Sequence, residues 1–235
     1  MLRHAFKVAA FLPVLVIPFL GSCTTIGSLS PFSKDDGGLD QVDDLVGRIG
    51  NLHTECELTK QNLRSVFKKL SAITEPGFRG DAVTAHAELE QEIALSENRA
   101  DSLEKRIKEM KKSAEPFFEE WIADLKSFSN ASMRARSQAR LTETRQRYDA
   151  IVAAVDPAYS GFVAYNESLR DIALFLEHDF NASPQLGADI QALVSIGKEI
   201  DVALDTTFAA AETYVQYAAL PTAPEPVTGG VETKQ

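Results

Sequence analysis

Hydrophobic residues recur along residues 42–218 at alternating steps of three and four. The mean step of about 3.5 residues is the repeat that keeps one face of an α-helix turned toward a neighbouring helix. Four segments carry this repeat without a break, and we call the repeating positions the seam of each helix. The seams run from Val42 to Ile73, from Ala82 to Trp121, from Leu141 to Leu176 and from Leu186 to Ala218. The pattern therefore predicts four long helices.

Helix-ending and helix-starting residues separate the four segments. Glu75-Pro76-Gly77 predicts the end of the first helix, because proline cannot continue a helix and glycine favours a turn. Ser129-Asn130 predicts the end of the second helix, with Ser132 as the capping residue of the third. Ser183-Pro184 predicts the start of the fourth helix, since it is a capping residue followed by a first-turn proline.

The predicted fold is an all-α, elongated antiparallel bundle of four coiled-coil-like helices over residues 39–218. Short connections make consecutive helices antiparallel neighbours. The seams continue past Pro116 and Pro157, so we expect these prolines to kink their helices and not to end them. A flexible tether over 23–38 and a disordered tail over 219–235 are expected to flank the bundle. An alternative is two long hairpins that pair only when the chain dimerises.

The second and third helices are predicted to be longer than the other two. A two-helix tip over residues 116–145 should therefore project roughly 20 Å beyond the four-helix body. One interpretation is that acidic residues of the second helix pair with arginines of the third while the aromatic rings fill a local core. The other is that a hairpin leaves the rings uncovered, to bind a protein partner, a second copy or lipid headgroups. The candidate interaction residues are Phe117, Phe118, Trp121, Phe128, Arg134, Arg136, Arg140 and Arg145.

The first 23 residues resemble a bacterial lipoprotein signal. Arg3 and Lys7 precede an apolar run over 8–19, and two small residues lead directly into Cys23. The run is shorter than the roughly 20 residues that span a bilayer, which disfavours an uncleaved membrane helix. We predict a signal peptide over 1–22 and lipid attachment at Cys23. By analogy with bacterial lipoproteins, Thr24 in place of Asp favours the outer membrane, with the protein facing the periplasm.

Charge and motifs exclude some classes of function. Loss of residues 1–22 removes two basic residues and no acid, so the net charge falls from −10 to −12. Such a chain is a poor candidate for binding nucleic acid. We predict no cofactor, no metal ligand and no catalytic residue, and we do not expect an enzyme. The alternative is a thiol enzyme that uses Cys56 and His53, but Cys56 occupies a seam position, where a buried inert thiol is the usual outcome.

Four short segments resemble the bacterial family called domain of unknown function 2959. They are Phe117-Phe118-Glu119-Glu120-Trp121, Ser129-Asn130-Ala131-Ser132-Met133-Arg134, Thr142-Glu143-Thr144-Arg145-Gln146-Arg147-Tyr148 and Leu174-Phe175-Leu176-Glu177-His178-Asp179-Phe180-Asn181-Ala182. The resemblance covers about residues 40–217 and implies a helical envelope protein, often with a lipoprotein signal, without an assigned activity.

The function that we predict is a lipid-anchored periplasmic bundle of non-catalytic binding, scaffold or spacer type. The membrane would hold it through the N-terminal lipid, and a protein partner or self-association would engage its surface. A helical protein that interacts with the membrane surface is the alternative.

Overall fold

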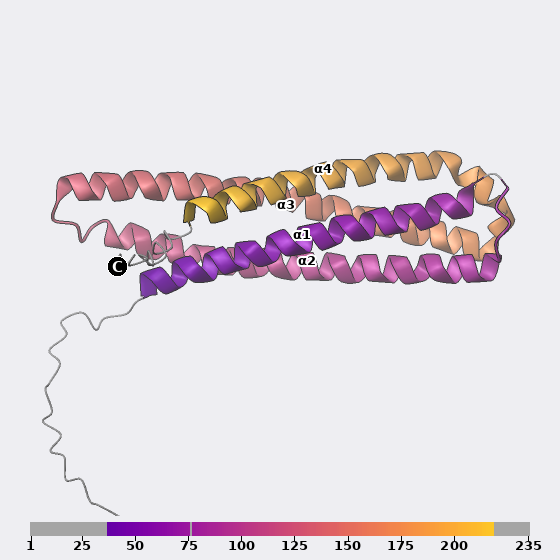
Figure 1. The fold of residues 1–235 in the computed structure, drawn as a ribbon, viewed down its shortest axis with the longest axis horizontal. Coiled ribbons are helices and arrows are strands. Elements are labelled where there is room, and N and C mark those ends of the chain that lie inside the picture. The colour runs from indigo at the N-terminus through magenta and orange to yellow at the C-terminus, as the bar shows by residue number, and fades with distance from the viewer. Residues whose placement is uncertain (1–36, 76, 219–235) are drawn as a thin grey trace, which may run out of the picture. The chain divides into compact units, whose positions relative to one another are not determined.

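The computed structural model describes residues 37–75 and 77–218, which form helices and short connections without a strand. Figure 1 shows the order of the elements along the chain. They are α1 (Gly37–Thr74), α2 (Ala82–Asp124), α3 (Ala131–His178), the 3₁₀-helix η1 (Phe180–Leu186) and α4 (Gly187–Ala218). The all-α bundle is thus confirmed. The predicted signal peptide, Cys23, the tail and the tether up to residue 36 lie outside the described residues.

The four helices pack together within one chain. Consecutive helices lie antiparallel, and α4 also packs along α1 (Figure 1). Ion pairs join α4 to α1: Lys60 contacts Asp205, and the Arg64 guanidinium lies 3.6 Å from the Asp201 carboxylate. The alternative of two hairpins that meet only in a dimer is therefore wrong. None of the helices within these ranges has an apolar stretch of the length that a membrane span needs.

The seams form the core. Phe118, Phe162, Leu52, Leu103 and Leu169 are among the largest side chains that are completely enclosed. Burying a leucine or phenylalanine side chain stabilises the folded chain by about 1.5–3 kcal/mol relative to leaving it exposed. This burial along four faces explains why such long helices hold together without disulfides.

Polar seam positions are satisfied internally. The Ser96 hydroxyl donates to Oδ1 of Asn166 over 2.7 Å, which joins α2 to α3. The hydroxyl groups of Thr59 and Thr207 donate to carbonyl oxygens one turn earlier in their own helices, over 2.8 and 2.9 Å. Buried polar groups cost stability only when they lack such partners, so the bundle tolerates them.

Two predicted helix starts need correction. Asn130, and not Ser132, caps α3, because its side-chain oxygen accepts hydrogen bonds from the backbone N–H groups of Ser132 and Met133 over 2.9 and 3.2 Å. The α4 helix begins at Gly187, since Pro184 and its neighbours form the tighter turns of η1. Proline has no N–H to donate, and a short 3₁₀ segment accommodates it before the α-helix begins.

The tip is present, but it is shorter than the predicted 116–145. Figure 1 shows the α2–α3 connection reaching beyond the ends of α1 and α4. The start of α1, however, lies beside the last turns of α2, where Gln41 donates a hydrogen bond to Glu120. On the other side, Arg140 of α3 donates to the backbone carbonyl of Tyr217 in α4 over 3.5 Å. The stretch without α1 or α4 beside it therefore lies between these two contacts.

Candidate functional site

The aromatic residues of the tip are mostly buried. Phe117 and Phe118 belong to the core, and Trp121 and Phe128 are half-buried against it. The Phe118 ring centroid lies 4.9 Å from that of Phe117 and 5.5 Å from that of Tyr148. Burial raises the pKa of the Tyr148 hydroxyl to about 12. The two phenylalanine rings thus fill a local core and do not present an open patch.

The pairing predicted at the tip, between the acids of α2 and the arginines of α3, is wrong. Arg145 pairs with Asp149 over 3.1 Å, and Arg140 and Arg147 both approach Glu143, over 3.8 and 3.5 Å. All of these partners belong to α3 itself. The carboxylates at the end of α2 form no ion pair with any residue that the structure describes; they are Glu115, Glu119, Glu120 and Asp124. The side chains of α3 satisfy one another along one helix because residues three or four apart are neighbours there.

The first ten residues of α3 make few contacts with the rest of the bundle, and we call residues 131–140 the α3 arm. Every arm residue is exposed except Ser137, whose hydroxyl accepts a hydrogen bond from the Trp121 indole over 2.9 Å. The side chains of Arg134 and Arg136 have no ion-pair or hydrogen-bond partner within the described ranges. Met133 is 54% exposed. The arm therefore presents unpaired positive charge beside an apolar side chain.

A hollow of about 200 Å³ lies on the other side of the same tip, between the start of α1 and the end of α2. We call it the acidic hollow. Its lining residues are Gln41, Val42, Phe117, Glu120, Trp121 and Asp124. The Gln41 side-chain oxygen is buried there without a hydrogen-bond partner among the described residues. Two carboxylates and an aromatic wall make this hollow a site for a cation with several N–H donors.

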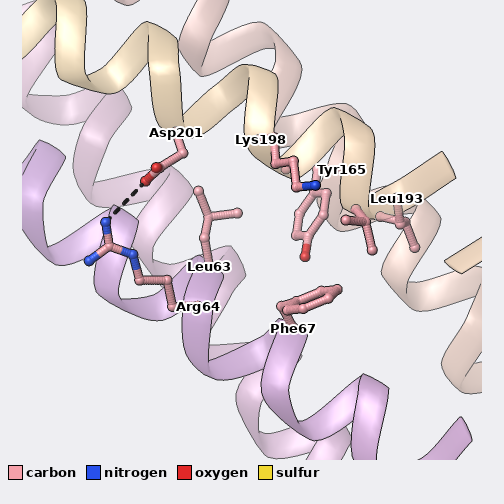
Figure 2. Close-up of a pocket in the computed structure, with 9 residues that line it drawn as sticks. Leu63, Arg64, Phe67, Tyr165, Leu193, Lys198 and Asp201 are labelled. Atoms are coloured by element: carbon pink, nitrogen blue, oxygen red, sulfur yellow. Dashed lines mark ion pairs between the residues drawn. The ribbon is translucent and has the colours of Figure 1, made fainter. Parts of the chain in front are cut away.

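A second hollow, of about 140 Å³, lies between α1 and α4. Figure 2 shows the Tyr165 hydroxyl pointing into it toward Phe67, with Leu63 and Leu193 on its walls. Burial raises the pKa of Tyr165 to about 12, so this hydroxyl stays protonated at neutral pH. Sites for drug-sized ligands usually measure 300–1,000 Å³. This hollow is smaller than that range.

Cys56 and His53 do not form a catalytic pair. Cys56 is completely buried, and burial raises its pKa to about 12, which leaves almost no thiolate at neutral pH. The His53 ring instead packs against Phe208, with 3.7 Å between the ring centroids and the two planes tilted by 31°. Among the residues that the structure describes, no three His, Cys, Asp or Glu side chains come together as a metal site.

Sequence reasoning missed the contribution of α1 to the tip. Gln41 and Val42 line the acidic hollow because α1 begins at Gly37, five residues before the first apolar seam position. The available signal was Asp40-Gln41, a polar start that a helix tolerates well since acidic residues favour the first turn. The periodicity of apolar residues cannot predict a first helical turn that is made of polar residues.

The comparisons with known proteins identify a family. The model of the family described as Protein of unknown function (DUF2959) matches residues 33–218, so the chain belongs to this family. Neither the curated proteins nor the solved structures contain a match to the chain.

Proposed function

We propose that this DUF2959 protein is a lipid-anchored component of the bacterial envelope that works by binding, as a scaffold or spacer. In this proposal Cys23 carries the lipid, the bundle stands in the periplasm at the outer membrane, and the tip engages another protein. No catalytic step is required of any residue. Residues 37–218 supply the reach, since the 48 residues of α3 alone extend about 72 Å at 1.5 Å per residue.

The observation that carries the proposal is the α3 arm. A helix in water gains most of its stability from packing one face against neighbours. The arm contacts the rest of the bundle through Ser137, which accepts from Trp121, and through Arg140 at its last position, which donates to the Tyr217 carbonyl. Among the described residues the side chains of Arg134 and Arg136 have no partner, and Met133 is exposed. Such a segment is well suited to binding, because a partner can cover it without displacing any contact inside the bundle.

The position of the arm agrees with a lipid anchor. Gln41 in the second turn of α1 bonds to Glu120, and the neighbouring Trp121 bonds to the arm. The chain therefore enters the bundle at the end where the arm lies. Cys23 precedes Gly37 by 14 residues, which can span at most about 50 Å. A lipid on Cys23 would hold this end of the bundle, and not the far end, near the membrane.

The thiol-enzyme alternative has little support. A nucleophilic cysteine needs a stabilised and accessible thiolate. Cys56 has neither property, because it is enclosed in the core with a pKa raised to about 12.

The anchor is tested by metabolic labelling of cells with a fatty acid. We expect the full chain to take up the label and to fractionate with outer membranes, and Cys23→Ala to lose both. Cys56→Ala is the matched control, since its thiol is buried and should not be acylated. A label that persists in Cys23→Ala would overturn the proposed anchor.

Binding through the tip is tested by photo-crosslinking in the same cells. A photo-reactive amino acid replaces Gln138 on the arm or, as the control, Gln191 on α4; both positions are exposed. We expect discrete protein adducts at position 138 and none at position 191. Equal adducts at both positions, or none at either, would contradict a role for the tip in binding.

A further inference from the structure

We infer that the acidic hollow of one chain receives the α3 arm of a second copy, and that the second chain's hollow receives the arm of the first. This inference rests on the proposed function, because it names the partner of the tip. The result is a reciprocal, two-fold contact between two tips. Such isologous contacts are the commonest way in which identical chains assemble.

The arm and the acidic hollow carry opposite charges. The arm offers Arg134 and Arg136, which have no partner among the described residues. The hollow offers Glu120 and Asp124, and its lining includes no residue of the arm. Each chain thus carries both halves of an ionic contact, and its own fold does not bring them together.

The side chains that line the hollow suit a guanidinium group. A guanidinium group has five N–H donors and binds carboxylates through paired hydrogen bonds. The carboxylates of Glu120 and Asp124 are the acceptors that the hollow offers. The ring of Trp121 on the same wall can contact the flat face of the guanidinium. An arginine satisfies this set, whereas a carboxylate or a phosphate would be repelled.

The arm and the acidic hollow lie at the same end of the bundle. Trp121 lines the hollow and also donates to Ser137 of the arm, so the two surfaces share a residue. A two-fold axis at the tip can therefore bring both arms to both hollows at once. The contact would also bury Met133 of the arm, whose side chain is 54% exposed.

An anionic membrane surface is a poorer occupant for the arm. The carboxylates of α2 lie at the same tip, together with Asp40, Asp43 and Asp44 at the start of α1. These groups repel anionic headgroups, while they attract the arm of another copy. The net charge of −12 after removal of residues 1–22 acts in the same direction.

Charge exchange tests the inference. The protein is the mature chain from residue 23 with Cys23→Ser, studied by sedimentation velocity at low salt. We expect a reversible dimer that dissociates at about 0.5 M salt, because screening then shortens the range of ionic attraction to a few ångströms. Arg134→Glu with Arg136→Glu should weaken the dimer by about tenfold or more, and so should Glu120→Arg with Asp124→Arg.

Mixing the two variants is the decisive step. Each variant alone places like charges on arm and hollow, whereas a mixture restores opposite charges in both contacts. We expect mixed dimers at near wild-type affinity. Lys68→Glu with Lys105→Glu is the control for the arm variant, because it changes the net charge by the same amount; both lysines are exposed and distant from the tip, so the dimer should persist. Helicity measured by circular dichroism checks that every variant folds.

Three results would overturn the inference. The first is a wild-type chain that stays monomeric at about 100 μM. The second is a pair of variants that each dimerise as the wild type does, and the third is a mixture that fails to dimerise. Sedimentation with vesicles of anionic and of neutral lipid is run in parallel, and arm-dependent binding of a monomer to anionic vesicles would assign the arm to headgroups. If the chain is acylated and crosslinks at position 138 but does not dimerise, the inference fails while the proposed function stands.

Discussion

One helix of this bundle has two different environments. Phe162 and Asn166, near the middle of α3, are buried in the core, where α3 packs against α2 and α4. Residues 131–140, at its start, are exposed except for Ser137. The periodicity of apolar residues therefore predicts which face of a helix is buried where a neighbouring helix is present. Whether a neighbour is present depends on the relative lengths of the helices.

The largest effect expected from this comparison is a cavity in the middle of α3. Phe162→Ala removes a completely buried ring and should lower the free energy of unfolding by about 3–5 kcal/mol. Met133→Ala, in the arm, should change it by less than about 0.5 kcal/mol. Urea denaturation followed by circular dichroism measures both. Similar losses for the two variants would abolish the distinction between middle and arm.

A smaller effect is expected from the buried polar pair. Asn166→Ala leaves the Ser96 hydroxyl in the core without its partner across 2.7 Å, which should cost about 1–3 kcal/mol. The control is Ser160→Ala, because that hydroxyl is exposed and donates only to the Asp156 carbonyl of its own helix. If both variants unfold at the wild-type urea concentration, Asn166 does not tie α2 to α3 in solution.

Stability should fall in alkaline solution. Burial raises the pKa of Cys56 from 9.0 to about 12, and that of Tyr165 from 10.0 to about 12. Both groups hold their protons more tightly in the folded chain than in the unfolded chain. Their contribution is therefore complete below pH 9 and is lost as pH rises toward 12.

The thiol alone should lower the free energy of unfolding by about 1.4 kcal/mol per pH unit at most within that window. Urea denaturation at a series of pH values, for the wild type and for Cys56→Ala, measures this slope. We expect the slope above pH 9 to be shallower in the variant, while the arm contributes nothing because its side chains remain in water. Identical slopes would mean that the thiol is accessible in the folded chain.

The smallest effect is expected at the cap of the arm. Asn130→Ala removes the acceptor for two backbone N–H groups, worth about 1 kcal/mol of local helix stability. Since the arm has few other contacts, it should fray without unfolding the bundle. Asp81→Ala removes the equivalent cap of α2, where Thr84 donates over 2.8 Å. Melting temperatures that fall far more for Asn130→Ala than for Asp81→Ala would contradict an independent arm.

Much of the fold could be predicted because apolar periodicity reports burial directly. The seam from Leu45 to Ile73 is buried at every position, and the seam of α3 stays in phase through Pro157. The buried ions could not be predicted in this way. Lys60 lies beside the seam and is buried only because Asp205 of α4 pairs with it there. Such a contact depends on which helices become neighbours, and spacing along one helix does not specify that.

The candidate site could be predicted in outline only. Composition identified the tip, yet it assigned Phe117 and Phe118 to an open surface as readily as to a core. Their burial depends on α1 and Tyr148, which lie far away in the sequence. The sequence does contain a feature that indicates the exposed arm. The steps of three and four that lead back from Leu141 reach Ser137 and Arg134, so the seam becomes polar where the neighbours end.

Hydrogen exchange along α3 tests the central claim most directly. In dilute, monomeric mature chain we expect amides of residues 134–140 to exchange at least about a hundredfold faster than amides of residues 160–172, which open only with the bundle. At concentrations where the chain associates, protection should appear in the arm. Uniform protection along α3 in the monomer would contradict the account, because the arm would then be covered by its own chain and would have no surface to offer a partner.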